Sequence, residues 1–436
     1  MESCARSALF EGYTEPVRDA LWGHIYLTPK LAAITASPPF MRLHRIMQLG
    51  PTLRVYPGAT RSRASHCFGV YHLARRLLIH LVEEGAGVWL SPEGVKSFLC
   101  AALLHDLGHF PYTHSLKELP LTEHEVLTAN LIVNDPIKSL VASAGADPYL
   151  TAAIVDNSLA GHKSGELDFF RKLLSGALDP DKLDYLSRDA RYCGVPYGVQ
   201  DVDFIFSRLY PHPKHGIEID SRGILGVESL LFSKYLMYRA VYWHKAVRSA
   251  TAMVKKALLG GLESGIINGE ELYNLDDQGL FTLIAQRNHP LFSLVDSVRN
   301  DRLFTAVVEI PFDEKVHGRL LSLSDRSRLE DGLAAEISLL FGKQLTGDSL
   351  IIDLPEPISF ECDLFVRDEN CFFSDGSSAF KSSLVDAFVN SLRVIRIFID
   401  PSIDPFIEET KSLETASQRE EILQITKKWL QLQDGS

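Results

Sequence analysis

The chain has 436 residues, 46% of them hydrophobic and 23% charged, and its formal net charge is −12. Such a chain can bury a substantial core in roughly two or three compact units, and its acidity argues against a general affinity for nucleic acid. The start of the chain lacks a secretion signal, no apolar run approaches the roughly 18 residues of a membrane span, and the cysteines form no C-x-x-C pair. We therefore expect a cytoplasmic protein with reduced thiols and no membrane partner.

The first unusual region in chain order is residues 20–82, which contain no Asp or Glu. Its basic residues are Lys30, Arg42, Arg45, Arg54, Arg61, Arg63, Arg75 and Arg76. Because this cationic segment leads directly into His66, we expect it to present positive charge to a polyanion. The alternative is that acids from elsewhere in the chain balance it.

The next informative element is a helix expected to begin at Ser91, a capping residue followed by proline. Its apolar residues recur at i, i+3 and i+4 until Gly108 ends the pattern. This spacing places the dipeptide His105-Asp106 in the last turn of the helix.

Two further helix starts follow. Thr122-Glu-His-Glu125 is typical of a capping box, which places His124 in the first turn of a helix. Asp179 followed by Pro180 predicts the start of another helix.

The helix that starts after Asp179 carries polar residues on two faces. Asp181, Tyr185 and Asp189 are four residues apart and share one face. Asp184 and Arg188 can pair on a neighbouring face.

A further helix is expected over residues 227–259, with a stripe formed by Tyr235, Tyr238 and Tyr242. Such a stripe is as often core or interface as it is functional. After about residue 300 the sequence predicts strands over residues 304–311, 349–354 and 392–399. Helices are expected over residues 326–341 and 419–433, interleaved with these strands. We therefore expect a mainly α core followed by a smaller C-terminal α+β lobe.

The pair His105-Asp106 places two possible metal ligands at a helix end, and a catalytic ion needs at least three protein ligands. His66, which closes the arginine-rich segment, and Asp181, which opens its helix, are the best candidates for the others. Two imidazoles and two carboxylates suit Mn, Mg, Fe, Zn or Ni without selecting one.

These residues stand in the order H…HD…D, which resembles the HD superfamily of metal-dependent phosphohydrolases and especially its dNTP triphosphohydrolase branch. The segments that resemble this branch are residues 23–27, 40–50, 56–59, 104–114, 179–189, 194–198 and 242–245. The resemblance implies an HD-domain core over residues 1–300, with the motif region at 60–190. It leaves residues 301–436 as a lobe for regulation or oligomerisation.

The resemblance also implies the roles of individual residues. His66, His105, Asp106 and Asp181 would hold a divalent metal ion. The phosphate contacts would come from Arg63, Lys182, Tyr185, Lys234 and Arg239, whose donors suit phosphate oxygens. Gln48 and Asp189 would lie near the sugar 3′-hydroxyl, and Tyr242 would pack against the deoxyribose and exclude a 2′-hydroxyl.

Three imidazoles remain for proton transfer to the leaving 5′-oxygen. We expect His114 to be the general acid, His124 to assist it and His109 to contact phosphate. Lys117 stands where the family has an Asp that partners the catalytic His, so Glu123 or Glu125 is the alternative partner. Three histidines that merely cap helices would be the structural alternative.

The expected activity is metal-dependent hydrolysis of dNTPs to deoxynucleoside and tripolyphosphate. The alternatives are HD-type hydrolysis of another phosphomonoester or phosphodiester, and a catalytically weak protein that binds nucleotides or nucleic acid. Ala36, Met41 and His44 replace the residues of the family's guanine-binding activator site, so activation through that site is not expected. We expect a nucleotide partner and a homo-oligomer, either a dimer or a tetramer.

Overall fold

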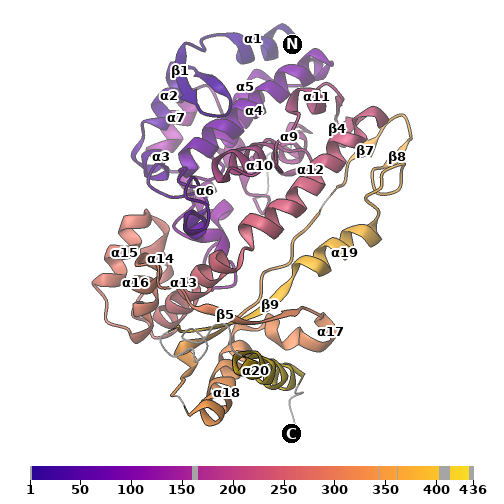
Figure 1. Cartoon of the computed structure of the whole chain (residues 1–436). Helices are drawn as coiled ribbons and strands as arrows, with labels where there is room; N and C mark the ends of the chain where they lie inside the picture. Colours follow the sequence, from indigo (N-terminus) through magenta and orange to yellow (C-terminus); the bar gives the residue numbers. More distant parts are fainter. Residues whose placement is uncertain (1, 160–164, 343, 361, 402–412, 432–436) are drawn as a thin grey trace.

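The computed structural model describes residues 2–159, 165–342, 344–360, 362–401 and 413–431. The fold is mainly helical, with small sheets that lie mostly toward the C-terminal end (Figure 1). The predicted fold class is therefore confirmed. Within the described ranges, no helix has both the length and the apolar character that crossing a membrane requires.

The first core is built around α4 (Arg63–Glu83), which packs between α5 (Pro92–Leu104) and α10 (Pro180–Cys193) (Figure 1). The side chains of α5 are buried on nearly all faces, as expected for a helix that is apolar all round. The helices α8 (Pro148–Val155) and α9 (Gly165–Ser175) cover it. Ends of three buried helices therefore meet inside one hydrophobic cluster.

The local signals of these helices are mostly confirmed. Ser91 caps α5 by accepting a hydrogen bond from the backbone N–H of Gly94. Asp179 caps α10 by accepting from the backbone N–H of Lys182 at 2.6 Å. Gly194 ends α10 with a φ of 68°, a left-handed conformation that favours glycine.

A second core lies beside the first and is formed by α13 (Lys245–Glu263), α14 (Gly269–Tyr273), α15 (Asp277–Ala285) and α16 (Ser293–Arg299). Its buried members from outside these helices are Phe110, Leu116, Leu119, Ile267, Phe292, Phe304, Ile351 and Phe398. The segment that follows His105-Asp106 thus leaves the first core and packs on the second.

The C-terminal lobe is a three-stranded antiparallel sheet in the order β5 (Thr305–Pro311), β9 (Val394–Ile399), β6 (Leu350–Asp353). It packs against α18 (Leu323–Phe341) and α20 (Leu413–Gln431). These elements confirm the predicted strands and helices, apart from residues 432 and 433, which lie outside the described ranges.

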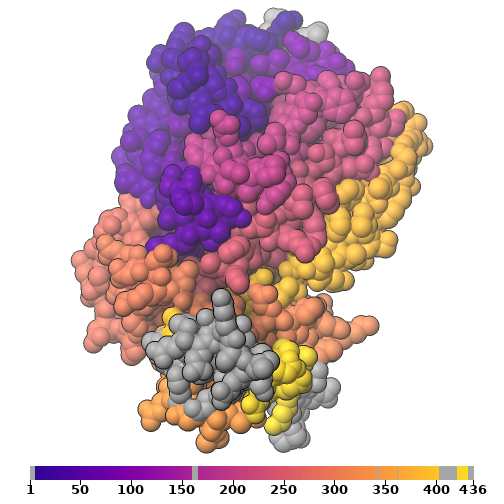
Figure 2. Space-filling view, viewed as in Figure 1, coloured from indigo at the N-terminus to yellow at the C-terminus, as the bar shows by residue number. Residues whose placement is uncertain are grey.

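Between β6 and β9 the chain leaves the lobe and runs along the side of the first core (Figures 1 and 2). There β7 (Phe365–Val366) pairs in parallel with β4 (Gly216–Ile219), beside β3 (Leu209–His212) and β8 (Cys371–Phe372). The chain then returns through α19 (Ser382–Leu392). The domain boundary at residue 300 stays a proposal, and this pairing crosses it.

The remaining elements surround the first core or extend the lobe. They are α1 (Glu2–Phe10), β1 (Glu15–Asp19), β2 (Gly23–Leu27), α2 (Pro29–Thr35), α3 (Pro38–Leu43), α6 (His124–Ile132), α7 (Ile137–Ser143), α11 (Val202–Phe206) and α17 (Glu314–His317).

The single helix expected over residues 227–259 is wrong. The chain forms α12 (Ile224–Met237), a π turn over Tyr238–Tyr242, and then α13. His244 has a ψ of 135°, which no helical residue adopts, and its ring accepts a hydrogen bond from the backbone N–H of Ala246. The tyrosine stripe is therefore divided between a helix and a π turn.

The capping box at Thr122 is also wrong, although α6 begins at His124 as predicted. The cap residue is Glu123, and its side chain makes no capping hydrogen bond. The Thr122 hydroxyl instead lies 3.1 Å from the hydroxyl of Tyr273, which also accepts from the Thr122 backbone at 2.8 Å. A tertiary contact has replaced the local one.

Most arginines of the cationic segment have partners within the molecule, which agrees with the alternative drawn from the sequence. Arg45, Arg54, Arg61, Arg63 and Arg76 pair with acids that come from later in the chain. Arg42 and Arg75 donate to backbone carbonyls. The acids that pair with this segment thus all come from outside residues 20–82.

Candidate active site

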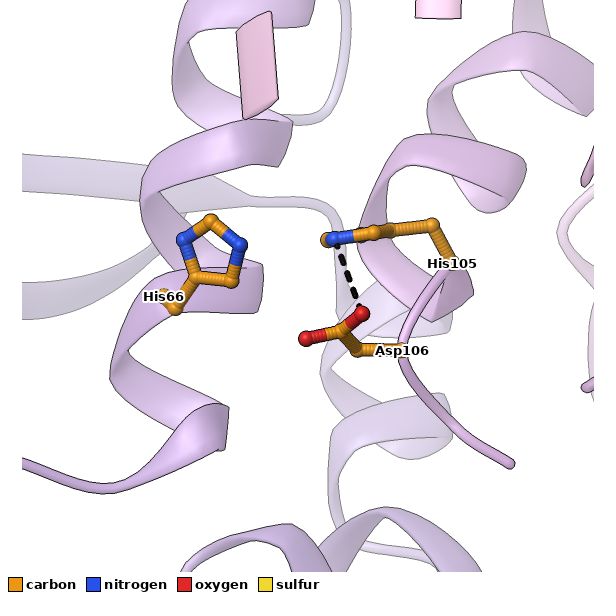
Figure 3. A group of neighbouring side chains, drawn as sticks. All are labelled: His66, His105 and Asp106. Carbon is orange, nitrogen blue, oxygen red and sulfur yellow. Dashed lines mark ion pairs between the residues drawn. The ribbon is translucent and has the colours of Figure 1, made fainter. Parts of the chain in front are cut away.

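His66, His105 and Asp106 lie together where α4 and α5 meet (Figure 3). Each offers a ligand atom, and these atoms all lie within 4.8 Å of one another. Asp181 joins them from α10, with Oδ1 2.9 Å from His66 Nε2 and 3.9 Å from His105 Nε2. The four candidate ligands named from the sequence therefore converge.

The protonation of His105 fits a metal ligand. Its Nδ1 lies 2.9 Å from the carbonyl oxygen of Ala102. A carbonyl only accepts, so Nδ1 carries the proton and Nε2 keeps a lone pair. That Nε2 atom is buried without a hydrogen-bond partner among the described residues. A buried acceptor of this kind is costly unless a cation satisfies it.

His66 lies between two carboxylates. Its Nε2 faces Asp181, and its Nδ1 lies 2.8 Å from Asp184 Oδ2. Burial lowers the pKa of His66, but the hydrogen bonds to both carboxylates outweigh it and raise the pKa to about 9. Burial raises the pKa of Asp181, and the bond to His66 outweighs this and lowers it to about 2. The two carboxylates thus concentrate negative charge around His66, and a metal cation can take the place of the His66 proton.

A second layer of residues orients His66. Arg188 donates to both oxygens of Asp184 at 2.8 Å and to Asp19 at 2.7 Å. The indole N–H of Trp22 also donates to Asp184. The sequence predicted the pairing of Asp184 with Arg188, but nothing in it indicated that Asp19 or Trp22 belongs to the site.

Gly69 permits this second layer to form. It lies one turn after His66 on α4, and a Cβ atom there would collide with the side chains of Asp184 and Arg188. Glycine therefore allows α4 and α10 to approach closely enough for the buried charges to meet.

Asp106 connects the candidate ligands to the neighbouring cation and imidazoles. Its Oδ2 accepts from Arg63 at 2.8 Å, and its Oδ1 lies 3.4 Å from His105 Nε2 and 3.3 Å from His109 Nδ1. Burial raises the pKa of Asp106, but His109, His105 and Arg63 together hold it well below its ordinary value. Asp106 is therefore ionised.

His109, His114 and His124 form an adjacent cluster of imidazoles. The Nε2 atoms of His109 and His114 are 3.1 Å apart, and the ring centroids of His109 and His124 are 3.9 Å apart. His109 is fully buried, whereas His114 is exposed. Although part of His114 is exposed, its ring packs against those of His109 and His124, so desolvation lowers its pKa, and the nearby charge of Arg63 lowers it further. A bound polyanion would counter that shift.

The turn that carries His114 has an unusual backbone. Tyr112 has a φ of 63°, a left-handed conformation that is rare for residues other than glycine. Thr113 closes the turn by accepting from the backbone N–H of Phe110 at 2.9 Å. Strained residues of this kind concentrate at functional sites.

The partner of the proton donor differs from both alternatives drawn from the sequence. Glu125 Oε2 lies 2.9 Å from His124 Nδ1, so this acid contacts His124 rather than His114. Glu123 is exposed at the start of α6, and Lys117 is exposed after the turn. The nearest hydrogen-bonding partner recorded for the His114 ring is His109.

The residues expected near the sugar also lie together. Asp189 accepts from the Tyr242 hydroxyl at 2.7 Å and from Arg61 Nε at 2.7 Å. The backbone N–H of Gln48 donates to the Arg61 carbonyl at 3.0 Å. Arg61 was not among the predicted site residues, and its position two residues before Arg63 was the available signal.

Several buried polar atoms around the cluster have no hydrogen-bond partner among the described residues. They are Gln48 Oε1, Arg61 Nη1, Arg63 Nε, His105 Nε2 and His109 Nδ1. Buried polar groups are nearly always satisfied, so such a concentration marks a place where a ligand or ordered water completes the bonding.

The other residues that were predicted to contact phosphate interact with groups that are not candidate metal ligands. The ammonium group of Lys182 contacts Asp179 at 2.6 Å. Lys234 donates to the carbonyl of Ser359, and Arg239 donates to the Tyr235 hydroxyl at 2.7 Å. Tyr185 packs near Tyr242, with ring centroids 6.3 Å apart.

Comparison with known proteins agrees with this geometry. Residues 63–149 match the HD domain family, and residues 209–378 match the family described as the HD associated region. The chain therefore contains an HD domain and an HD associated region, and the candidate ligands His66, His105 and Asp106 lie inside the matched HD domain.

Among curated proteins, an uncharacterised protein of Bacillus subtilis is 34% identical over 55% of this chain and 54% of its own length. The deoxynucleoside triphosphate triphosphohydrolase SAMHD1 of Homo sapiens is 26% identical over 56% of this chain and 44% of its own length. The chain thus spans about half the length of the curated relatives it matches.

Solved structures share the fold over nearly the whole chain. A hypothetical protein of Aquifex aeolicus has a TM-score of 0.68 at 22% identity, covering 93% of this chain and 99% of the other. A phosphohydrolase of Bacteroides thetaiotaomicron has a TM-score of 0.68 at 23% identity, covering 88% and 99%. The elements after residue 300 therefore belong to a shared architecture.

Proposed function

We propose that this protein is a metal-dependent phosphohydrolase that converts dNTPs to deoxynucleoside and tripolyphosphate. The observation that carries the proposal is the convergence of His66, His105, Asp106 and Asp181 beside three further imidazoles. The similarity to deoxynucleoside triphosphate triphosphohydrolases supports the choice of substrate.

In this proposal the four convergent side chains hold one divalent ion, and Mn, Mg, Fe, Zn and Ni remain candidates. A bound ion would polarise the α-phosphoryl group and neutralise the charge that develops on it. Asp184 holds the ring of His66 in place, and the Ala102 carbonyl does the same for His105. The ligands are thus oriented before substrate arrives.

The leaving 5′-oxygen needs a proton, which we assign to His114. It is the exposed member of the imidazole cluster, and it contacts His109. The negative charge of a bound triphosphate raises the pKa of a neighbouring imidazole and so favours the protonated donor. His124 assists as its neighbour, and His109, which lies 3.3 Å from Asp106, faces the phosphates.

We assign the selection of a deoxyribose to Tyr242, because its side chain is held in a fixed position. Its hydroxyl donates to Asp189, which Arg61 holds from the other side. A ring fixed in this way can exclude a 2′-hydroxyl by steric contact. Gln48 and Asp189 then face the 3′-hydroxyl, and Arg63, Lys182, Tyr185, Lys234 and Arg239 remain the proposed phosphate contacts.

The alternative of another phosphomonoester or phosphodiester uses the same ligands and differs only in its products. The alternative of a nucleic-acid-binding protein loses its main support, because the arginines of residues 20–82 pair within the molecule. A nucleotide is therefore the expected partner. The proposal also includes a homo-oligomer of two or four copies.

The direct test incubates the purified protein with each dNTP and with Mn²⁺ or Mg²⁺, and separates the products by ion-exchange chromatography. Deoxynucleoside and tripolyphosphate in equal amounts are the expected products. A nucleoside monophosphate would favour the alternative substrate class, and no release of deoxynucleoside from any dNTP under any divalent metal would contradict the proposal. Ribonucleotides in parallel reactions test the role assigned to Tyr242.

A further inference from the structure

The loop that carries His114 is anchored differently from the metal-binding helices. Phe110, Leu116 and Leu119 are buried in the second core, together with Ile351 and Phe398 of the C-terminal lobe. The candidate ligands instead project from α4, α5 and α10 of the first core. The position of the proton donor relative to the ligands thus depends on how the second core and the lobe are held.

Glu118 connects this loop to both of those regions. Its carboxylate accepts from Lys255 of α13 and from both terminal nitrogens of Arg326 of α18. The side chains of Lys255 and Arg326 are 7% and 3% exposed, so water contributes little to this contact. Desolvation raises the pKa of Glu118, and the two cations outweigh it and lower the pKa. Buried, charge-assisted bonds of this kind are strong and directional.

The chain segment between His114 and Glu118 is short and rigid. A 3-10 turn covers Thr113–Leu116, and the backbone N–H of Leu119 donates to the Leu116 carbonyl at 2.9 Å. A movement of Glu118 therefore moves the turn that holds His114. Lys117 is exposed and offers no carboxylate to the imidazole. Contacts of other residues must therefore hold the turn in place.

We infer that Arg326, acting through Glu118, positions the His114 turn, so that the C-terminal lobe completes the proton-donating half of the site. Arg326 is a positioning residue and touches no substrate in this account. The inference rests on the proposed function, because it assigns His114 the proton transfer. It gives the lobe a task in catalysis.

The step affected is the departure of the nucleoside. Water adds to the α-phosphorus and loses one proton to the solvent, the bond from this phosphorus to the 5′-oxygen breaks, and the electron pair of that bond remains on the 5′-oxygen. His114 gives its proton to that oxygen, which yields the neutral nucleoside and tripolyphosphate. A displaced His114 would slow only this proton transfer, and a leaving group that needs no proton would be indifferent to the displacement.

The test compares Arg326→Met and Arg326→Lys with the matched control Arg328→Met, in the full chain. Arg328 lies on the same helix, is 75% exposed and pairs with Asp325. Each protein is assayed with a dNTP and with its analogue in which sulfur replaces the 5′-oxygen, because a thiolate leaves without protonation. Calorimetry with Mn²⁺ alone measures metal binding.

Arg326→Met should lower kcat for the dNTP by about 10- to 100-fold with a nearly unchanged KM, since small misplacements of catalytic groups have such effects. The sulfur analogue should lose less than about threefold in kcat, and Mn²⁺ affinity should not change. Arg326→Lys should recover part of the loss, and Arg328→Met should resemble the wild type. Equal losses on both substrates, or a parallel loss of Mn²⁺ binding, would overturn the inference.

Hydrogen exchange provides a readout that does not depend on activity. Amides of residues 113–119 should exchange faster in Arg326→Met than in the wild type, whereas those of α5 should be unchanged. Unchanged protection of residues 113–119 would overturn the inference with the proposed function intact. A wild-type protein that cleaves no dNTP would instead overturn the proposed function, and this inference with it.

Discussion

The two halves of the candidate site are built in different ways. The metal-binding half comes from the buried ends of α4, α5 and α10, and a layer of charges around Asp184 fixes its ligands. The proton-donating half stands on a turn with a left-handed Tyr112 and is tied by Glu118 to α13 and α18. One half is thus rigid within a single core, and the other depends on the contact between two cores and a lobe.

Because the two halves are held by different contacts, binding of the ion and proton transfer should be separable by mutation. A change in the first core should act on metal affinity, and a change in the second should act on kcat. The following variants test that separation.

The largest effect is expected from His105→Ala. It removes a ligand whose Nε2 is buried without another partner. Because a bound ion contributes several kcal/mol to the transition state, activity should fall by on the order of a thousandfold or more. Mn²⁺ binding measured by calorimetry should be lost as well. His24→Ala, at an exposed position on β2, serves as the control; retained Mn²⁺ binding in His105→Ala would contradict the ligand assignment.

His114→Gln should lower kcat by about a hundredfold to a thousandfold, which is typical for loss of a general acid. Its affinity for Mn²⁺ should remain within about threefold of the wild type, since the rings that His114 contacts are those of His109 and His124, which are not candidate ligands. Single-turnover kinetics and calorimetry measure the two quantities. If both fell together, the two halves would not be separable.

Asp184→Asn should weaken metal binding by about 10- to 100-fold, because a group that orients a metal-ligating histidine usually contributes that much. It also leaves Arg188 paired with Asp19 alone, so the midpoint of urea unfolding should fall. Asp203→Asn is the control, since Asp203 pairs with Arg76 at the surface with 82% of its side chain exposed. An unchanged Mn²⁺ affinity would show that Asp184 does not orient His66.

The smallest effect is expected from Asp277→Asn. Asp277 lies on α15 of the second core, and its carboxylate accepts a hydrogen bond from the backbone N–H of Met47 at 2.9 Å. Burial raises the pKa of Asp277 from 3.8 to about 6. The folded protein therefore holds this proton more tightly than the unfolded chain. The stabilisation is complete below about pH 4 and is lost as the pH rises through 6.

Asparagine keeps the acceptor for Met47 but does not titrate. The free energy of unfolding of Asp277→Asn relative to wild type should therefore increase by about 1 to 2 kcal/mol between pH 4 and pH 8. Urea titrations of both proteins at the two values measure this difference. A difference that does not change with pH would be inconsistent with the raised pKa.

Local signals predicted much of the fold. The caps at Ser91 and Asp179 and the strands near residues 305, 350 and 394 are where the sequence indicated. The helix over residues 227–259 failed because a π turn has no distinctive local pattern, and the cap at Thr122 failed because Tyr273 competes for its hydroxyl. Apolar periodicity reports burial and is insensitive to such interruptions.

All four candidate ligands could be named from the sequence. Capping and periodicity place His105, Asp106 and Asp181 near helix ends, and the H…HD…D order adds His66. Other contacts are visible only in the folded molecule: the ion pairs that arginines of residues 20–82 make with distant acids, the contact of Arg61 with Asp189, and the contact of Arg326 with Glu118. The physical reason is that buried charges take partners from distant segments. Sequence spacing carries no record of which acid and which base are buried together.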